Sequence, residues 1–134
     1  YKRQILGRDS VAVMAEEDLV KYISYASKIH GHSAKVEQRI YSSDSIPFAD
    51  SGVPAVNFCR FGERGAAYIH DRFDTLDFLS AEALEKTARY VLAFSWGMVN
   101  AAAFPVKREI PKNIVEEVEK YLYKKELAEA EENK

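Results

Sequence analysis

The sequence predicts an α/β fold, because short apolar runs that suit strands alternate with amphipathic stretches that suit helices. In chain order the pattern is strand, helix, strand, short helix, strand, long helix and a last helix. The 134 residues are 47% hydrophobic and 30% charged, which fits one globular domain or a piece of a larger one. Three strands are few for such long helices, since sheets hold about five or six. We therefore expect a fragment whose other half of the domain is absent.

The first half of the chain contains two expected strands around a helix. Residues 11–14 are a continuous apolar run that suits a buried strand. Residues 16–30 carry apolar side chains at three- and four-residue spacings, start with acidic residues and end before a glycine, which predicts a helix. His30 and His32 flank this end and are expected in a cap or an exposed loop. Residues 34–41 alternate polar and apolar side chains and predict a second strand.

The second half carries a polar turn, a strand and the longest helices. The turn at 42–45 is followed by a short helix that Pro47 can start and Gly52 can end. Residues 53–61 suit a third strand. Ser80 is expected to cap a long helix that reaches Ala103.

One stripe of the long helix is largely apolar, and from Tyr90 to Ala103 the pattern is apolar almost all round, so we expect this end to be buried. The apolar stripe of the long helix consists of Leu84, Ala88, Val91, Leu92, Ser95 and Val99. A last helix is expected from Lys112 to about Ala130.

Charge, apolar content and cysteine usage exclude several classes of protein. A net charge of −2 gives no basic surface for nucleic acid. No apolar run reaches the roughly 18 residues that cross a bilayer, so no membrane partner is expected. The single cysteine, Cys59, lies in an apolar run and is expected to be a buried small side chain. It cannot form an internal disulfide, which favours the cytoplasm as compartment.

The loop between the third strand and the long helix is the first candidate site. His70 stands there with Asp71, Asp74 and Asp77 nearby in sequence. Imidazole is the commonest metal ligand and carboxylates commonly orient it, although a structural role for a lone loop histidine is the alternative. A zinc site needs three or four ligands, and Asp44, in a turn that also follows a strand, is the best remote candidate. Phosphate-binding loops, C-x-x-C and nucleophile-elbow motifs are absent from the sequence.

Two segments together resemble motifs of the M28 family of zinc peptidases, which comprises aminopeptidases and carboxypeptidases, with glutaminyl cyclases as relatives on the same fold. Residues 43–55, SDSIPFADSGVPA, resemble S-D-H-x-x-F-x-x-x-G-I/V-P, and residues 68–80, YIHDRFDTLDFLS, resemble Y-H-T-x-x-D-T-x-D-x-x-S. The resemblance implies a three-layer zinc-exopeptidase-like fold with a mixed sheet. Residues 1–104 would be the C-terminal half of this catalytic domain, and residues 105–134 a helical extension.

The resemblance also implies roles for individual residues. His70 falls on a zinc ligand of the family, and Asp74 falls on the aspartate that braces the ligand loop. The segments 42–48 and 62–68 would line the substrate pocket. The implied substrate-binding residues are Asp44, Ser45, Phe48 and Tyr68.

The other metal ligands and the general-base glutamate precede this region in the family, so the resemblance implies that they lie upstream of this chain. The intact protein would hold one or two zinc ions that activate water against peptides with a free N-terminus, whereas the isolated chain would not hold zinc and would be inactive. The missing N-terminal half or another chain would pack on the exposed sheet, and a homo-oligomer is compatible with this.

Two departures from the family motifs keep alternatives open. Ser45 stands where the family often has histidine, and Ile69 stands where many members have a tyrosine directly before the ligand. A cyclase-like member of the fold is one alternative. A non-catalytic member that acts as a binding module is the second, and an α/β domain with a structural His70 is the third.

Overall fold

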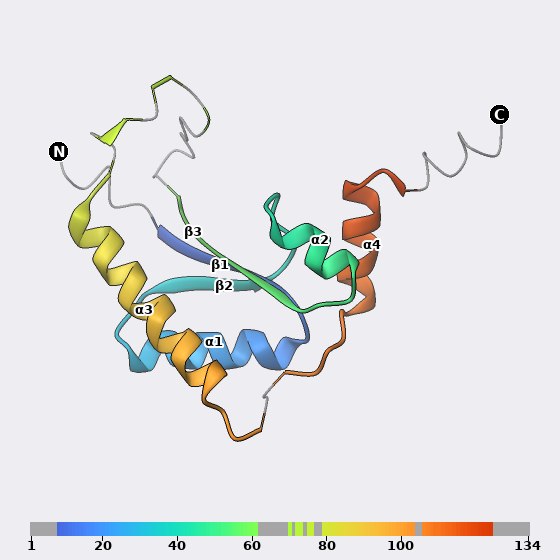
Figure 1. The fold of residues 1–134 in the computed structure, drawn as a ribbon, viewed down its shortest axis with the longest axis horizontal. Helices are drawn as coiled ribbons and strands as arrows, with labels where there is room; N and C mark the ends of the chain where they lie inside the picture. Colours follow the sequence, from blue (N-terminus) through green and yellow to red (C-terminus); the bar gives the residue numbers. More distant parts are fainter. Residues whose placement is uncertain are drawn as a thin grey trace.

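The computed structural model describes residues 8–61, 70, 72–73, 75–76, 79–103 and 106–124. Strands and helices alternate along these residues as the sequence predicts, and Figure 1 shows their arrangement. The elements are β1 (Arg8–Met14), α1 (Glu17–Ile29), β2 (Ala34–Gln38), α2 (Ser45–Asp50), β3 (Ala55–Phe61), α3 (Ala81–Val99) and α4 (Lys112–Tyr121).

The described strands form a mixed sheet in the order β2-β1-β3. The central strand β1 runs parallel to β2, with Val11 opposite Val36, and antiparallel to β3, with Val11 opposite Phe58. A helix, α1, connects the parallel pair, because parallel strands need a crossover between them. The predicted α/β class with a mixed sheet is therefore confirmed.

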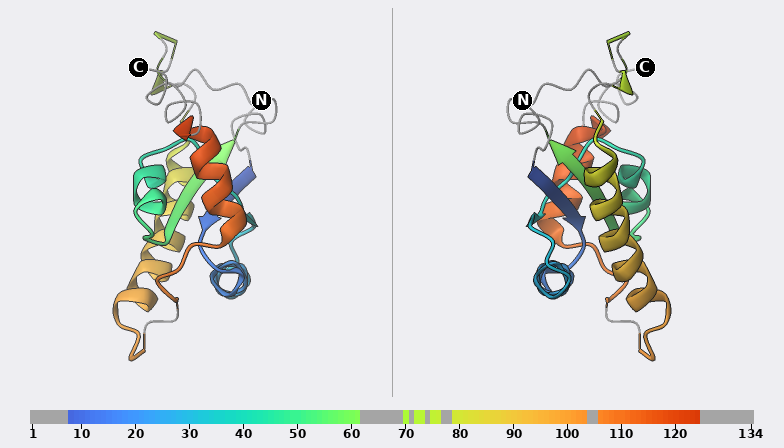
Figure 2. Two further views of the ribbon diagram at one scale, coloured as in Figure 1. Left: turned by 90° about the vertical axis from the view of Figure 1, so that its right-hand side faces the viewer. Right: turned by 90° about the vertical axis from the view of Figure 1, so that its left-hand side faces the viewer.

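Helices cover both faces of the sheet. Side chains of β1 alternate between these faces, so the strand contributes apolar residues to a core on each side. Val11 and Val13 face one core, where they pack with residues of α1 and α3. Met14 faces the other core and packs with residues of α2 and α4. Figure 2 shows α4 in front of the strands from one side and α3 in front of them from the opposite side.

The predicted elements are confirmed, with ends that differ by a few residues. α1 occupies Glu17–Ile29 of the expected 16–30, and both β2 and β3 are shorter than their apolar patterns. Gly31 and Gly52 follow α1 and α2 with φ of 62° and 74°, a left-handed conformation that glycine adopts without steric cost. Ser80 caps α3 as expected, since its Oγ accepts from the N–H of Ala83 at 3.3 Å.

The expectation that the second half of α3 is buried is wrong for one of its faces. Tyr90 and Phe94 are buried against the sheet and α1. In contrast, Leu92, Trp96 and Val99 are 66%, 69% and 83% exposed. The helix carries two apolar stripes, and the aromatic one packs on the sheet. The stripe that begins at Leu84 faces solvent in the described part of the chain.

The last helix is shorter than predicted within the described residues. α4 ends at Tyr121, whereas the pattern suggested a helix to about Ala130, and residues beyond 124 lie outside the described ranges. None of the helices that the structure describes is long and apolar enough to span a bilayer.

Candidate functional site

His70 is the one predicted metal ligand, and the structure places it on an exposed turn before α3. Its φ is 64°, a left-handed conformation that histidine adopts more readily than most residues other than glycine. Backbone conformations of this kind cluster at functional sites, where surrounding structure holds them. Asp74 and Tyr68, the expected bracing and substrate-binding residues of this loop, lie outside the described residues.

The two candidate segments leave the sheet at opposite ends. The turn that carries Asp44 follows β2, which runs parallel to β1. His70 follows β3, which runs antiparallel to β1, so the carboxyl ends of β2 and β3 point in opposite directions. After β2 the chain runs back along α4, from Gln38 beside Asn113 to Ser42 beside Tyr121, so strand direction alone does not decide how close Asp44 lies to His70.

A metal site is not assembled by the described residues alone. Within the ranges that the structure covers, no three His, Cys, Asp or Glu side chains form a group that could hold a metal ion. A zinc ion needs at least three protein ligands, and His70 supplies one imidazole. The described residues therefore do not fit a zinc ion without further ligands.

Hydrogen bonds between serines shape the turn before α2. Ser43 donates to the carbonyl of Tyr41 at 3.2 Å and shares a hydrogen bond of 2.5 Å with the hydroxyl of Ser45. Asp44 caps α2 with a helical backbone and makes no side-chain cap hydrogen bond, and it is exposed. Phe48 is 59% exposed. The carboxylate of Asp44 and the ring of Phe48 are thus both exposed and lie about one helical turn apart along the chain.

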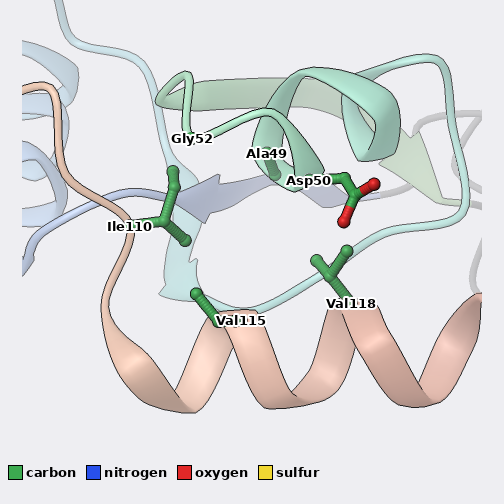
Figure 3. A pocket seen from close by; sticks show the side chains of 6 residues that line it. All are labelled: Ala49, Asp50, Gly52, Ile110, Val115 and Val118. Carbon is green, nitrogen blue, oxygen red and sulfur yellow. The ribbon is translucent and has the colours of Figure 1, made fainter. Parts of the chain in front are cut away.

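A small recess lies beside this segment, between α2 and α4 (Figure 3). Its volume is about 80 Å³, whereas pockets for drug-sized ligands occupy roughly 300–1,000 Å³. It is too small to receive a peptide side chain together with its backbone. The lining residues are Ala49, Asp50, Gly52, Ile110, Val115 and Val118.

A buried polar network that the sequence did not predict is centred on Asp9. Its carboxylate lies 3.1 Å from His32 Nε2 and 3.2 Å from Arg60 Nη1. Thr87 donates to the same carboxylate at 3.3 Å. The His32 ring stacks on Tyr90, with ring centres 4.4 Å apart.

The expectation that His32 lies in an exposed loop is wrong, because its side chain is 10% exposed. The network joins β1, β3, α3 and the α1–β2 connection, and buried charges of this kind need such partners. One signal in the sequence could have found it. Asp9 stands two residues before Val11, so period-two alternation places it on the same buried face of β1.

Cys59 and Tyr90 are held in their neutral forms. Burial raises the pKa of the half-buried Cys59 thiol above its ordinary value, and its Sγ donates to the carbonyl of Ser10 at 3.3 Å. Burial likewise raises the pKa of Tyr90, whose hydroxyl donates to the carbonyl of Ile23 at 3.0 Å. The thiolate is the nucleophilic form of cysteine, so Cys59 is not set up for nucleophilic catalysis.

Comparison with known proteins gives one match at the level of families. Residues 6–95, more than half of the chain, match the family model described as Peptidase family M28. No curated protein matches the chain. No solved structure matches it either.

Proposed function

Because the chain belongs to peptidase family M28, we propose that it is part of an exopeptidase that removes residues from the free N-terminus of peptides. The family match over residues 6–95 carries this proposal, since it covers both motif segments and most of α3. Membership of the family supports hydrolysis of peptide bonds. The preference for a free N-terminus is our proposal and rests on the resemblance to aminopeptidases of the family.

His70 is the residue that this chain would contribute to a zinc site. Three properties of His70 support this role: it is a histidine, its side chain is exposed, and its backbone is left-handed. Asp74 would brace the loop behind it. The remaining ligands and the general-base glutamate would come from polypeptide outside the described residues.

The turn before α2 would contact the substrate. The exposed Asp44 carboxylate suits a free amino group, and the exposed ring of Phe48 suits an apolar side chain. Ser45 lies between them with its hydroxyl bonded to Ser43. Tyr68 would complete the substrate-binding residues from the loop before His70.

A second candidate function is favoured by two residues of the motifs. Ser45 and Ile69 stand where the family motifs often have histidine and tyrosine, and a cyclase-like member that acts on N-terminal glutamine is favoured if these changes remove the peptidase chemistry. A non-catalytic member that binds peptides without cleaving them is the remaining alternative.

The test compares three substrates with the full-length protein that carries this chain. We expect release of nitroaniline from an aminoacyl-nitroanilide and no release from the same compound with an acetylated amine, because an aminopeptidase needs the free amine. Equal cleavage of both compounds would contradict the aminopeptidase type. Conversion of an N-terminal glutaminyl peptide, without release of nitroaniline, would establish the cyclase-like alternative. Binding of peptides with no turnover would establish the binding module.

A further inference from the structure

The helix α4 lies outside the part of the chain that matches the family, yet it packs on one of the two family motifs. The match ends at residue 95, and α4 spans Lys112–Tyr121. Its buried residues Ile114 and Val118 pack with Ile46 and Ala49 of α2. Figure 3 shows α4 running along α2, with the connection from β2 passing between them. This apolar contact fixes α4 beside the turn that carries Asp44.

Polar contacts join α4 to the chain between β2 and α2 in regular steps. Each step of four residues along α4 meets a step of two residues along the connection. Four residues of helix advance about 6.0 Å and two residues of strand about 6.6 Å, so the two repeats stay in register. The pairs are Asn113 with the Gln38 side chain at 3.1 Å, Glu117 with the N–H of Ile40 at 3.5 Å, and Tyr121 with the Ser42 hydroxyl at 2.6 Å.

Tyr121 makes the shortest of these contacts and the one nearest to the candidate substrate-binding residues. Its partner Ser42 directly precedes Ser43, whose hydroxyl bonds to Tyr41 and Ser45 and so shapes the turn. Lys124 adds an ion pair to Asp50 at the far end of α2. The hydrogen bond to Ser42 and the ion pair to Asp50 therefore hold the α2 segment on both sides of Asp44 and Phe48.

We propose, on the premise of the proposed function, that Tyr121 is a positioning residue for the substrate-binding turn. Its hydroxyl holds Ser42 and thereby keeps the Asp44 carboxylate in the place where it meets the substrate's amino group. The phenol itself touches no substrate. Its loss weakens binding by letting the turn move, and leaves the bond-breaking step unchanged.

The first test uses Tyr121→Phe, which removes one hydroxyl from a side chain that is 42% exposed and leaves no cavity. Hydrogen exchange of the amides from 41 to 46 is measured in the 134-residue chain. We expect exchange there to rise about three- to tenfold, as the loss of one hydrogen bond predicts, with unchanged exchange in β1. The matched control is Tyr123→Phe, two residues further on, at a side chain that is 66% exposed. Equal exchange in both variants would overturn the proposal.

The second test uses the same variants in the full-length protein. We expect Tyr121→Phe to raise KM for an aminoacyl substrate about three- to tenfold with kcat nearly unchanged, and Tyr123→Phe to change neither. A fall in kcat at constant KM, or no change in either constant despite faster exchange, would overturn the positioning role. An unmodified protein without turnover would contradict the proposed function instead, while the exchange experiment would still decide whether Tyr121 holds the turn.

Discussion

Asp9 is the residue on which the polar interior of the described structure converges. Its carboxylate contacts His32, Arg60 and Thr87, and it is 8% exposed. A buried carboxylate and the donors around it together contribute little to the net free energy of folding, because burying charges is costly. Removal of one charged partner is nevertheless strongly destabilising, because the other buried groups lose the interaction that offset their burial. Asp9 therefore holds its neighbours in place more than it adds to the free energy of folding.

Replacement of this carboxylate tests that account. We expect Asp9→Asn to lower the free energy of unfolding by about 2–4 kcal/mol, because a neutral amide would replace the buried carboxylate that His32 and Arg60 contact. The control is Asp18→Asn, whose ion pair with Lys21 is exposed and is expected to contribute about 0–0.5 kcal/mol. Urea unfolding of the two variants measures both values. Similar small losses would show that the network around Asp9 is not formed.

α3 shows where prediction from sequence reached its limit. Its existence and its Ser80 cap follow from periodicity and residue type, and both were correct. Its buried face was not predictable, since one stripe carries leucines and the other carries Tyr90 and Phe94, and both are apolar. The choice depends on contact with the sheet, which lies far away in sequence. The burial of His32 could not be predicted for the same reason. It depends on contact with Asp9, which belongs to another element.

The orientation of α3 can be tested with two aromatic residues on its opposite faces. Phe94 is 9% exposed and Trp96 is 69% exposed. We expect Phe94→Ala to lower the free energy of unfolding by about 3–4 kcal/mol and Trp96→Ala by less than about 0.5 kcal/mol. Chemical denaturation of the 134-residue chain measures both. A larger loss at Trp96 than at Phe94 would mean that the helix is rotated and that Phe94 does not pack on the sheet.

At the scale of the molecule, the structure shows a well-defined scaffold, whereas the described residues do not by themselves complete the candidate site. Helices pack on both faces of the mixed sheet, and the family match covers the elements from β1 into α3. We expect further polypeptide, from an N-terminal half of the domain or another chain, to pack on the sheet, and the exposed stripe on α3 offers an additional apolar surface. That expectation stays a prediction.

The candidate site could be predicted from sequence to a smaller extent than the fold. His70 is predicted as a ligand from its residue type and its place in a motif, which need no tertiary information. Its ligand partners could not be identified in the same way, because a metal site gathers residues from distant segments. Asp44 illustrates this, since it lies on the connection after β2 whereas His70 lies on the connection after β3.

Zinc content is the most direct test of the claim that His70 belongs to a metallopeptidase site. We expect the full-length protein to hold one or two zinc ions and His70→Ala to lose at least one of them. His30→Ala, at the exposed C-cap of α1, is expected to keep the full content. The 134-residue chain alone should hold no stoichiometric zinc, because its described residues supply too few ligands. Unchanged zinc in His70→Ala, or a full-length protein without zinc, would contradict this account.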